Sequence, residues 1–296
     1  MPRVEPGVGT HDFTVLPPLL PSYLRALLGA CKPATAGHFP PLAASVRGVS
    51  VDAQHVARFR RAFELPAAGP VPPTYAHVLA GPLQLYLLTH PDFPLRVPGT
   101  VHVQNPVRQW RALRVGERVD LAVSLSGPRS VAQGIEHELC TEVRDAGGAL
   151  IWRGVSTNLL RRPGAARALP QTVAGAAAPA WERAWRLWLP ADAGRRYATL
   201  SGDWNPIHLS WVTARLFGFR RAIIHGMWTY ARALAALEPQ LDGEDLELDV
   251  RFRRPLLLPG HATLRAARRD GGWDWVLQDP QGRVSHAQGS VRPPQS

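Results

Sequence analysis

The order of predicted elements occurs twice along the chain, and this repeat limits the possible folds more than any other feature of the sequence. In the second part, a strand-like stretch precedes a short helix, "ADAGRRYATLSG", and a helix from His225 with one apolar stripe, "HGMWTYARALAAL". Four strand-like stretches follow that helix. The first part shows the same order: a strand, a short helix "DAQHVARFRRAFEL", a long apolar helix "TYAHVLAGPLQLYLLTH", and four strand-like stretches between Thr100 and Leu160. We interpret this pattern as an internal duplication.

A long helix followed by an antiparallel meander predicts an α+β fold, in which each sheet wraps around a long helix. Residues 161–180, "RRPGAARALPQTVAGAAAPA", contain almost no large apolar side chains, which is the composition of a linker. The sequence therefore predicts a first domain over residues 1–160 that includes an N-terminal extension, a linker over 161–180, and a second domain over 181–296.

Composition and charge exclude several classes of protein. The net charge is +11, and Lys32 is the only lysine, so the positive charge is almost all arginine, whose fork suits phosphate groups. The arginines are scattered or paired and have no aromatic base-stacking motif beside them, which argues against a nucleic-acid partner. No run approaches the roughly 18 apolar residues of a membrane span, so we expect none.

The N-terminal segment contains "LLGAC", which ends at Cys31 and superficially resembles the lipid-attachment site of an exported lipoprotein. Three prolines and Arg25 precede it, and we expect them to break both the helix and the apolar run of a signal peptide. The second cysteine, Cys140, is far away in the sequence, so a disulfide framework is not expected. These features together predict a cytoplasmic protein.

The two parts differ between the short helix and the long helix. The second part has residues 201–224 there, including "SGDWNPIHLS", whereas the first part runs from Leu65 to Pro73 through "LPAAGPVPP". The first part therefore lacks an equivalent acid and histidine. If the two parts pair, one can supply the chemistry and the other a wall of the pocket.

Asp203 and His208 lie on a segment that predicts a rigid loop between two helices. Pro206 biases Asn205 toward an extended backbone, so the acid and the histidine do not share one helical face. Gly202 is a natural C-terminal stop for the preceding helix. A carboxylate and an imidazole that converge on one water can take its proton and return it to a neighbouring carbon, which is typically worth about 10²–10⁴ in rate. The simpler interpretation is that Asp203 caps a helix and His208 is an ordinary loop histidine.

The stretches "YATLSGDWNPIHLSWVTA" and "GFRRAIIHGMWTYA" resemble the signature of the MaoC-like (R)-specific enoyl-CoA hydratases and dehydratases, the hydratase 2 group of the hot-dog fold. The matching positions within residues 197–231 are Tyr197, Ser201, Gly202, Asp203, Asn205, Pro206, His208 and Ala214. The resemblance implies tandem hot-dog domains that pack as an intramolecular pseudo-dimer. The first domain would then be a degenerate copy and the second the catalytic one.

The resemblance also implies roles for individual residues. Asp203 and His208 would activate a water, and the backbone N–H of Gly226 would hold the thioester carbonyl. A helix N-terminus is suited to that role, because its unpaired donors and partial positive charge face an oxygen that becomes enolate-like. Residues that would support the loop are Ser201, Gly202 and Asn205. No metal or other cofactor is expected, since coenzyme A or phosphopantetheine enters as part of the substrate.

The activity implied by the resemblance is reversible hydration of trans-2-enoyl thioesters to (3R)-hydroxyacyl thioesters. The partner would be an acyl-CoA or an acyl-carrier protein, and two chains could associate further as a homodimer. One position departs from the family. Well-studied single-domain members have a serine two turns beyond the glycine, where this chain has Leu234, so a substrate contact through that serine is in doubt.

Three alternatives stay open at this point. A hot-dog thioesterase would usually place its carboxylate on the long helix, where the first acid after Gly226 is Glu238, at the helix end. A non-catalytic acyl-thioester-binding subunit is a second alternative. The third is a metal site that adds His225 to the acid–histidine pair, although the spacing matches no metal motif. We instead predict that His225 begins the helix and packs against the strands.

A final observation concerns Arg251, Arg253 and Arg254, which lie on the strand after the long helix. They could meet the phosphates of coenzyme A or of a phosphopantetheine arm. A solvated strand face is an equal alternative.

Overall fold

The structure is a computed structural model that describes residues 9–29, 41–97, 99–162, 180–241 and 244–294. Most of the predicted linker, at residues 163–179, and Cys31 lie outside these ranges. Within them, no helix is long and apolar enough to cross a membrane.

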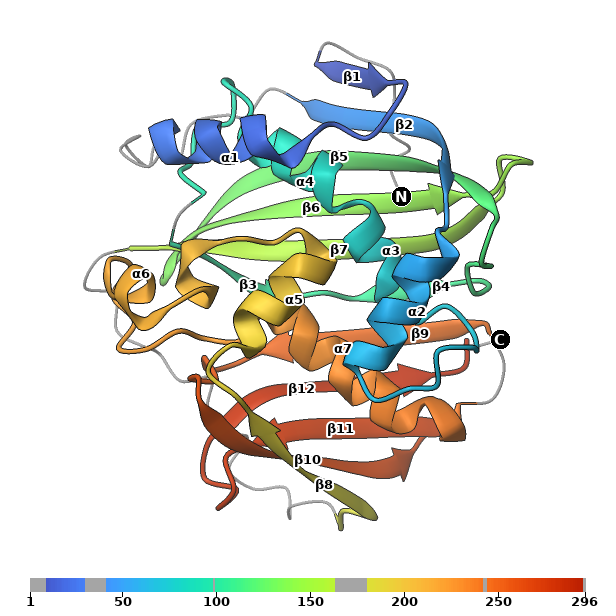
Figure 1. Cartoon of the computed structure of the whole chain (residues 1–296), viewed down its shortest axis with the longest axis vertical. Helices are drawn as coiled ribbons and strands as arrows, with labels where there is room; N and C mark the ends of the chain where they lie inside the picture. The colour runs from blue at the N-terminus through green and yellow to red at the C-terminus, as the bar shows by residue number, and fades with distance from the viewer. Residues whose placement is uncertain (1–8, 30–40, 98, 163–179, 242–243, 295–296) are drawn as a thin grey trace.

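Both halves contain a five-stranded antiparallel sheet with the same order (Figure 1). The first half has the order β2 (Leu42–Ser50), β5 (Arg118–Val131), β6 (Gly134–Arg144), β7 (Leu150–Arg161) and β3 (Thr100–Gln104). The second half has the order β8 (Arg183–Leu189), β10 (Gly260–Arg269), β11 (Gly272–Gln278), β12 (Ser285–Arg292) and β9 (Leu246–Phe252). If these five strands of each half are numbered along the chain, their order across the sheet is 1-3-4-5-2 in both halves. The topology therefore contains the predicted repeat.

The two sheets join edge to edge into one twelve-stranded sheet. At the junction, β3 and the short β4 (Val107–Gln109) pair antiparallel with β9, where Gln104 lies opposite Arg251 and Val107 opposite Leu248. At the other edge of the first half, β1 (Thr10–Phe13) adds to β2 in parallel. The expected pseudo-dimer therefore shares a continuous sheet.

The helices cover one face of this sheet (Figure 1). The first half contributes α1 (Leu19–Leu28), α2 (Ala53–Ala62), α3 (Tyr75–Leu79) and α4 (Gly81–Leu88), and the second α5 (Ala193–Ser201), α6 (Trp211–Arg215) and α7 (Gly226–Leu237). In α7, Tyr230, Leu234 and Leu237 are buried, as the predicted apolar stripe requires. The helix packs on β11 and β12, which makes the second half a helix wrapped by strands.

The long helix predicted in the first half is wrong as one element, because it is divided into α3 and α4 at Ala80. Pro82 lies in the first turn of α4. Proline has no N–H and its ring clashes with the carbonyl four residues earlier, so α3 cannot continue through it unbroken. The four strands expected between Thr100 and Leu160 are five, because Asn105 and Pro106 separate β3 from β4.

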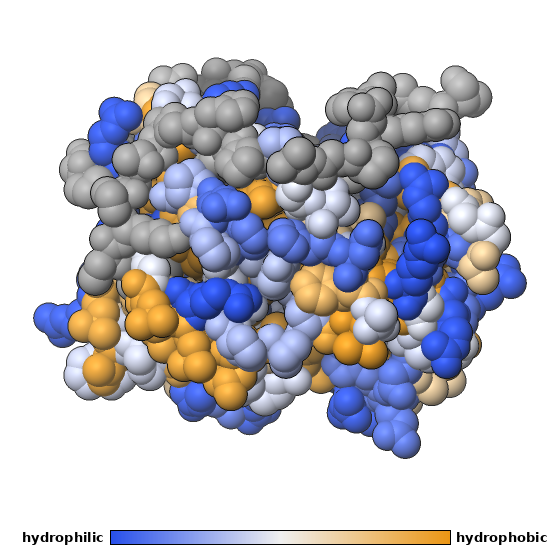
Figure 2. All heavy atoms as spheres, turned by 90° about the horizontal axis from the view of Figure 1, so that it is seen from above, coloured by the Kyte–Doolittle hydropathy of each residue, from blue (hydrophilic) through white to orange (hydrophobic). Residues whose placement is uncertain are grey.

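The N-terminal extension was expected to contain no helix, and this expectation is wrong. Helix α1 tolerates Pro21 because the residue is in the first turn, where a backbone N–H has no partner within the helix. Figure 2 looks onto the end of the molecule that carries β1 and α1, where apolar side chains lie at the surface among hydrophilic ones. The exposed leucines of α1 are Leu20, Leu24, Leu27 and Leu28.

A buried ion pair links the helices of the two halves. Arg60 of α2 is 1% exposed, and its guanidinium donates to both carboxylate oxygens of Glu238, at 2.7 and 3.1 Å. Glu238 directly follows α7. The carbonyl oxygens of Pro66 and Pro70 accept the remaining bonds of Arg60 at 2.7 and 2.5 Å. This buried charge is therefore both paired and hydrogen-bonded.

Candidate active site

A cavity of about 580 Å³ lies between the two halves. Its walls come from α1, α3, α4, β3 and β7 of the first half, and from the loop after α5, the start of α7 and the end of β9 in the second. All six residues that the sequence singled out line it: Ser201, Gly202, Asp203, Asn205, His208 and Gly226. The expectation that the first half supplies part of the pocket wall agrees with this arrangement.

The backbone of the loop has the predicted geometry, with one addition. Gly202 ends α5 in the left-handed conformation, with φ of 72°. Asn205 is extended before Pro206, with φ of −55° and ψ of 125°, and its side chain accepts from the N–H of Ile207 at 3.4 Å. The addition is a single 3₁₀ turn over Pro206–His208, which ends at the histidine. Each of these features fixes the direction in which the acid and the histidine point.

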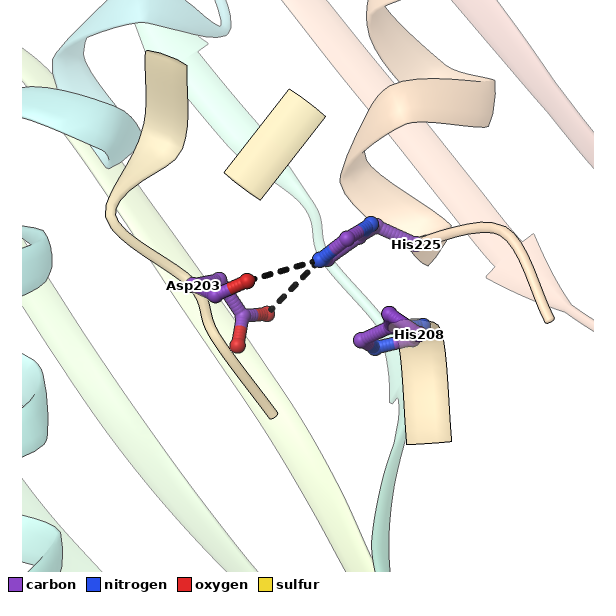
Figure 3. Close-up of side chains that lie close together, drawn as sticks. All are labelled: Asp203, His208 and His225. Carbon is purple, nitrogen blue, oxygen red and sulfur yellow. Dashed lines mark hydrogen bonds and ion pairs between the residues drawn. The ribbon is translucent and has the colours of Figure 1, made fainter. Parts of the chain in front are cut away.

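Asp203 is held by three contacts, while about half of its side-chain surface, 51%, stays accessible. Its Oδ1 accepts from the N–H of Asn205 at 3.1 Å, and its own N–H donates to the Ser201 hydroxyl at 3.2 Å. The third contact comes from His225, whose Nε2 lies 2.9 Å from the Asp203 carbonyl oxygen and 3.8 Å from Oδ2 (Figure 3). Since a carbonyl can only accept, this nitrogen carries the proton.

His208 lies directly beside His225, and the two rings stack with centroids 3.6 Å apart (Figure 3). Nδ1 of His208 is 2.8 Å from the carbonyl oxygen of Ile223, so Nδ1 carries the proton and Nε2 keeps its lone pair. His225 is the N-cap residue of α7, as predicted for a helix start. Its ring lies against the rings of His208 and Tyr197, and its packing against the strands stays a prediction.

The surroundings give the two predicted catalytic side chains different charge states. Burial, and secondarily the adjacent His225, lowers the pKa of His208 to about 3. Removal from bulk water alone would raise the pKa of Asp203, but the neighbouring imidazoles and one backbone N–H outweigh that effect and hold the pKa below its usual value. At neutral pH the site therefore contains a carboxylate and a neutral imidazole with a free lone pair.

Two glycines allow close approaches around this pair. A Cβ at Gly194, on α5, would lie 2.1 Å from the carbonyl oxygen of His208, so only glycine lets the helix pack against that backbone. A Cβ at Gly226 would lie 3.1 Å from the ring of Phe252. Gly226 is the first residue of α7, where backbone N–H groups have no partner within the helix.

Tyr23 is a residue of this site that the sequence did not indicate. Its hydroxyl donates to the carbonyl oxygen of Gly202 at 2.5 Å and accepts from the N–H of Trp204 at 2.7 Å. These two groups flank Asp203, so α1 holds the backbone on both sides of the acid. Gly202 and Trp204 lie about 180 positions from Tyr23 along the chain, so no local sequence pattern could have revealed the contact.

The ligand atoms of Asp203, His208 and His225 lie within 4.8 Å of one another. Among the described residues this is the one histidine, cysteine and acid group whose spacing could hold a metal ion. One nitrogen of each histidine lies at hydrogen-bond distance from a backbone carbonyl, and in His225 it is Nε2, the nitrogen that faces Asp203 (Figure 3). The spacing of the three residues admits a metal, and the expected absence of a metal stays a prediction.

The other residues named from the sequence have different positions. Leu234 is buried in α7 and is not part of the described cavity wall, whereas Thr229, one turn after Gly226, is. Glu238 is also outside that wall, in the ion pair with Arg60. Arg253 and Arg254 line the cavity, and Arg251 does not.

The sequence of this chain is similar to sequences of a known protein family. Residues 170–273 match the model of the MaoC like domain. A Mycobacterium tuberculosis protein named 3-hydroxyacyl-thioester dehydratase X is 34% identical over 282 residues, which is 92% of this chain and 97% of that protein.

Solved structures show the same relationship. The crystal structure of HtdX of Mycobacterium tuberculosis superimposes with a TM-score of 0.74 at 32% identity, over 85% of this chain and all of that chain. A second Mycobacterium tuberculosis protein, described as having a double hotdog fold, shares the fold at 14% identity with a TM-score of 0.52, over 88% of this chain and 96% of its own. The tandem hot-dog architecture predicted from the sequence is confirmed, and the chain belongs to the MaoC-like dehydratase family.

Proposed function

We propose that this chain catalyses the reversible hydration of trans-2-enoyl thioesters of coenzyme A or of a carrier protein to (3R)-hydroxyacyl thioesters. The observation that carries the proposal is the pair of Asp203 and His208 in the cavity, one ionised and one neutral with Nε2 unprotonated. Similarity to a 3-hydroxyacyl-thioester dehydratase over nearly the whole chain supports the same chemistry. The R configuration rests on the family resemblance.

In this mechanism, Nε2 of His208 and the carboxylate of Asp203 both bind the attacking water. As the water oxygen bonds to C3, the C2–C3 double bond opens and its electrons move toward the thioester oxygen. The N–H of Gly226 stabilises that oxygen. One proton of the water passes through Asp203 and His208 to C2. Water is therefore added across the double bond with no net oxidation or reduction. No redox cofactor takes part.

Arg253 and Arg254 support a substrate that carries phosphate. They line the same cavity as the catalytic pair, and guanidinium groups bind phosphate through paired hydrogen bonds. Coenzyme A and phosphopantetheine both supply such groups.

The alternative of a thioesterase has less support. Its candidate carboxylate, Glu238, accepts two hydrogen bonds from Arg60 and lies outside the described wall of the cavity. It therefore cannot reach a thioester bound beside Gly226. A purely acyl-binding subunit would have no use for a water-activating pair with separate charge states.

The first experiment follows the loss of ultraviolet absorbance of crotonyl-CoA and of a longer trans-2-enoyl-CoA, together with an assay for free thiol. We expect hydration without thiol release, and a fall of about 10²-fold or more in Asp203→Asn and His208→Ala. Chiral analysis of the product should give the R enantiomer. Treatment with a chelator should leave the rate unchanged.

Asp270→Asn and His261→Ala are matched controls, since both residues lie outside the described cavity wall and are exposed. They should keep the parental rate. Release of thiol would favour the thioesterase. Inactivity toward coenzyme A and carrier-protein thioesters alike would favour a binding subunit, and loss of rate with the chelator would favour the metal site.

A further inference from the structure

The first-half wall of the cavity contains a cluster of polar side chains, which the hydration chemistry does not require. The cluster consists of His77 of α3, Gln84 of α4, His102 of β3, and Ser156 and Asn158 of β7, on a wall that also includes Tyr23, Thr100 and Arg161. The matching strands of the second half, β9 and β12, instead bury Leu248, Val250, Ala287 and Val291.

The strand register shows that the polar groups are built into the sheet. His102 lies opposite Asn158, and Asn158 lies opposite His137 of β6, so the three side chains form one row across three strands on the same face. His137 is 1% exposed, which makes this the buried face. One step along β7, the Ser156 hydroxyl accepts from Nδ2 of Asn105 at 2.8 Å. The row therefore runs from the partly accessible His102 and Asn158, which line the cavity, to the buried His137.

The helices above the row hold their polar side chains in fixed positions. Nε2 of Gln84 donates to the Thr141 hydroxyl at 3.1 Å and lies 3.3 Å from Nδ1 of His77. Since Gln84 supplies the donor, His77 is left with an N–H on Nε2, and Gln84 with its carbonyl oxygen. The rings of His77 and His102 stack with centroids 5.9 Å apart. A donor and an acceptor thus stand together on the wall, already positioned by neighbours.

Burial lowers the pKa of His77 to about 4 and that of His102 to about 3, so both rings are neutral at physiological pH. Two neutral rings repel neither sign of charge and bind other groups through hydrogen bonds. Nε2 of His102 is buried and has no hydrogen-bond partner among the described residues, so this nitrogen can still form a hydrogen bond with a ligand. Buried polar atoms are seldom left unpaired in folded proteins.

We propose that the first-half wall is a subsite for a hydroxyl or amide group of the thioester substrate, a group that both donates and accepts a hydrogen bond. This inference rests on the proposed function, which places the thioester beside Gly226. Leu85, Leu88, Leu139 and Leu159 line the same cavity and pack the apolar remainder of the chain. The group can come from the acyl chain, as a hydroxyl substituent, or from the pantetheine arm, as an amide.

The test compares trans-2-octenoyl-CoA with analogues that carry a hydroxyl at successive positions of the acyl chain. We expect the parent protein to favour one hydroxylated analogue by about tenfold in kcat/KM, and that ratio to fall to about one in Gln84→Leu and in His102→Phe. A ratio of two substrates on one protein is independent of how much of the variant is folded. Leu87→Met, an apolar change on the same helix at a buried position outside the described cavity wall, should keep the parental ratio.

N-acetylcysteamine thioesters of the same acids, which lack most of the arm, identify the source of the group. A preference that persists with them assigns the subsite to the acyl chain. If the variants lose rate equally on plain and hydroxylated coenzyme A thioesters but not on the truncated ones, the subsite binds the arm. The proposal is overturned if the variants change neither the ratio of hydroxylated to plain substrate nor the ratio of coenzyme A thioesters to truncated thioesters.

Calorimetry with saturated octanoyl-CoA and its hydroxylated analogues separates this inference from the proposed function, because these ligands cannot be hydrated. A preference in Kd of about tenfold that disappears in Gln84→Leu would support the subsite even in a protein without hydratase activity. Equal affinities in the parent, together with an affinity for octanoyl-CoA that is unchanged in Gln84→Leu and hydration that is intact, would reject the subsite and leave the proposed function standing.

Discussion

The two halves of this protein share one strand order but differ in what fills the space beside their central helices. The second half places 24 residues between α5 and α7, and they carry Asp203 and His208. The first half crosses the same interval by a short Pro-rich stretch, and its sheet presents a polar row. The scaffold therefore occurs twice, while each copy contributes a different set of side chains to the shared cavity.

The difference extends to single helix positions. Asp52 and Asp192 both occupy the N-cap position of their helices, before Ala53 of α2 and Ala193 of α5. The next residue is Gln54 in the first half and Gly194 in the second. Only α5 has the Asp203–His208 loop returning across it, so only α5 needs a residue without a side chain. A functional loop thus imposes its requirement on an element that takes no part in the chemistry.

The largest effect is expected from removing the Arg60–Glu238 ion pair, which joins the two halves. Arg60→Met leaves Glu238 without its partner and two proline carbonyls without their donor, so we expect the free energy of unfolding to fall by about 3 kcal/mol. Urea denaturation measures it. Arg61→Met, an exposed position on the same helix, should change it by less than about 0.5 kcal/mol. Equal stability of the two variants would mean that this ion pair does not hold α2 to the second half.

The next prediction sharpens the comparison of α2 with α5. Gly194→Ala places a methyl group against the carbonyl of His208, and a shift of the histidine by about 1 Å is expected to lower kcat by about 10²-fold. Steady-state hydration of crotonyl-CoA gives the value, and circular dichroism verifies folding. Gln54→Ala is the matched change in the first half, at an exposed position, and should have no effect. Parental activity in Gly194→Ala would show that His208 tolerates displacement.

The smallest expected effect is an absence of pH dependence. Because burial lowers the pKa of His208 to about 3 and the pKa of Asp203 is also lowered, both groups keep their active states well below neutrality. We expect kcat/KM to vary by less than about twofold between about pH 5 and pH 8. A fall in rate with an apparent pKa near 6.5 would contradict the neutral state assigned to His208.

The pH profile of activity needs a control for stability, because the free energy of unfolding also depends on pH. Burial also lowers the pKa of His77 and of His137 to about 4, so the unfolded chain binds more protons than the folded one below about pH 6.5. The free energy of unfolding should therefore fall as the pH falls, by up to about 1.4 kcal/mol per pH unit for each such histidine. Activity should be compared only where the protein is folded.

Much of the fold could be predicted because its signals are local. The apolar stripe of α7, the glycine stop after α5 and the alternating strands depend on neighbours within a few residues. The break between α3 and α4 was also available locally, at Pro82, but the apolar run on both sides masked it. Helix α1 was missed for the opposite reason, since its prolines lie where a helix can accept them.

The site was predictable only where its residues share one segment. Asp203, Asn205 and His208 lie within six positions, and the loop chemistry that orients them is readable. Tyr23 and His77 reach the cavity only through the packing of α1 and α3, so sequence spacing contains no record of them. The stack of His225 on His208 likewise depends on how α7 meets the loop.

The continuous sheet at the β3, β4 and β9 junction has a consequence for assembly. Two dissimilar subunits encoded separately would mix, and a fraction of their pairs would combine like with like. Fusing both into one polypeptide fixes the stoichiometry at one to one, whatever the expression level. Each half is then free to accumulate changes that would be harmful if the same change appeared on both sides of the cavity.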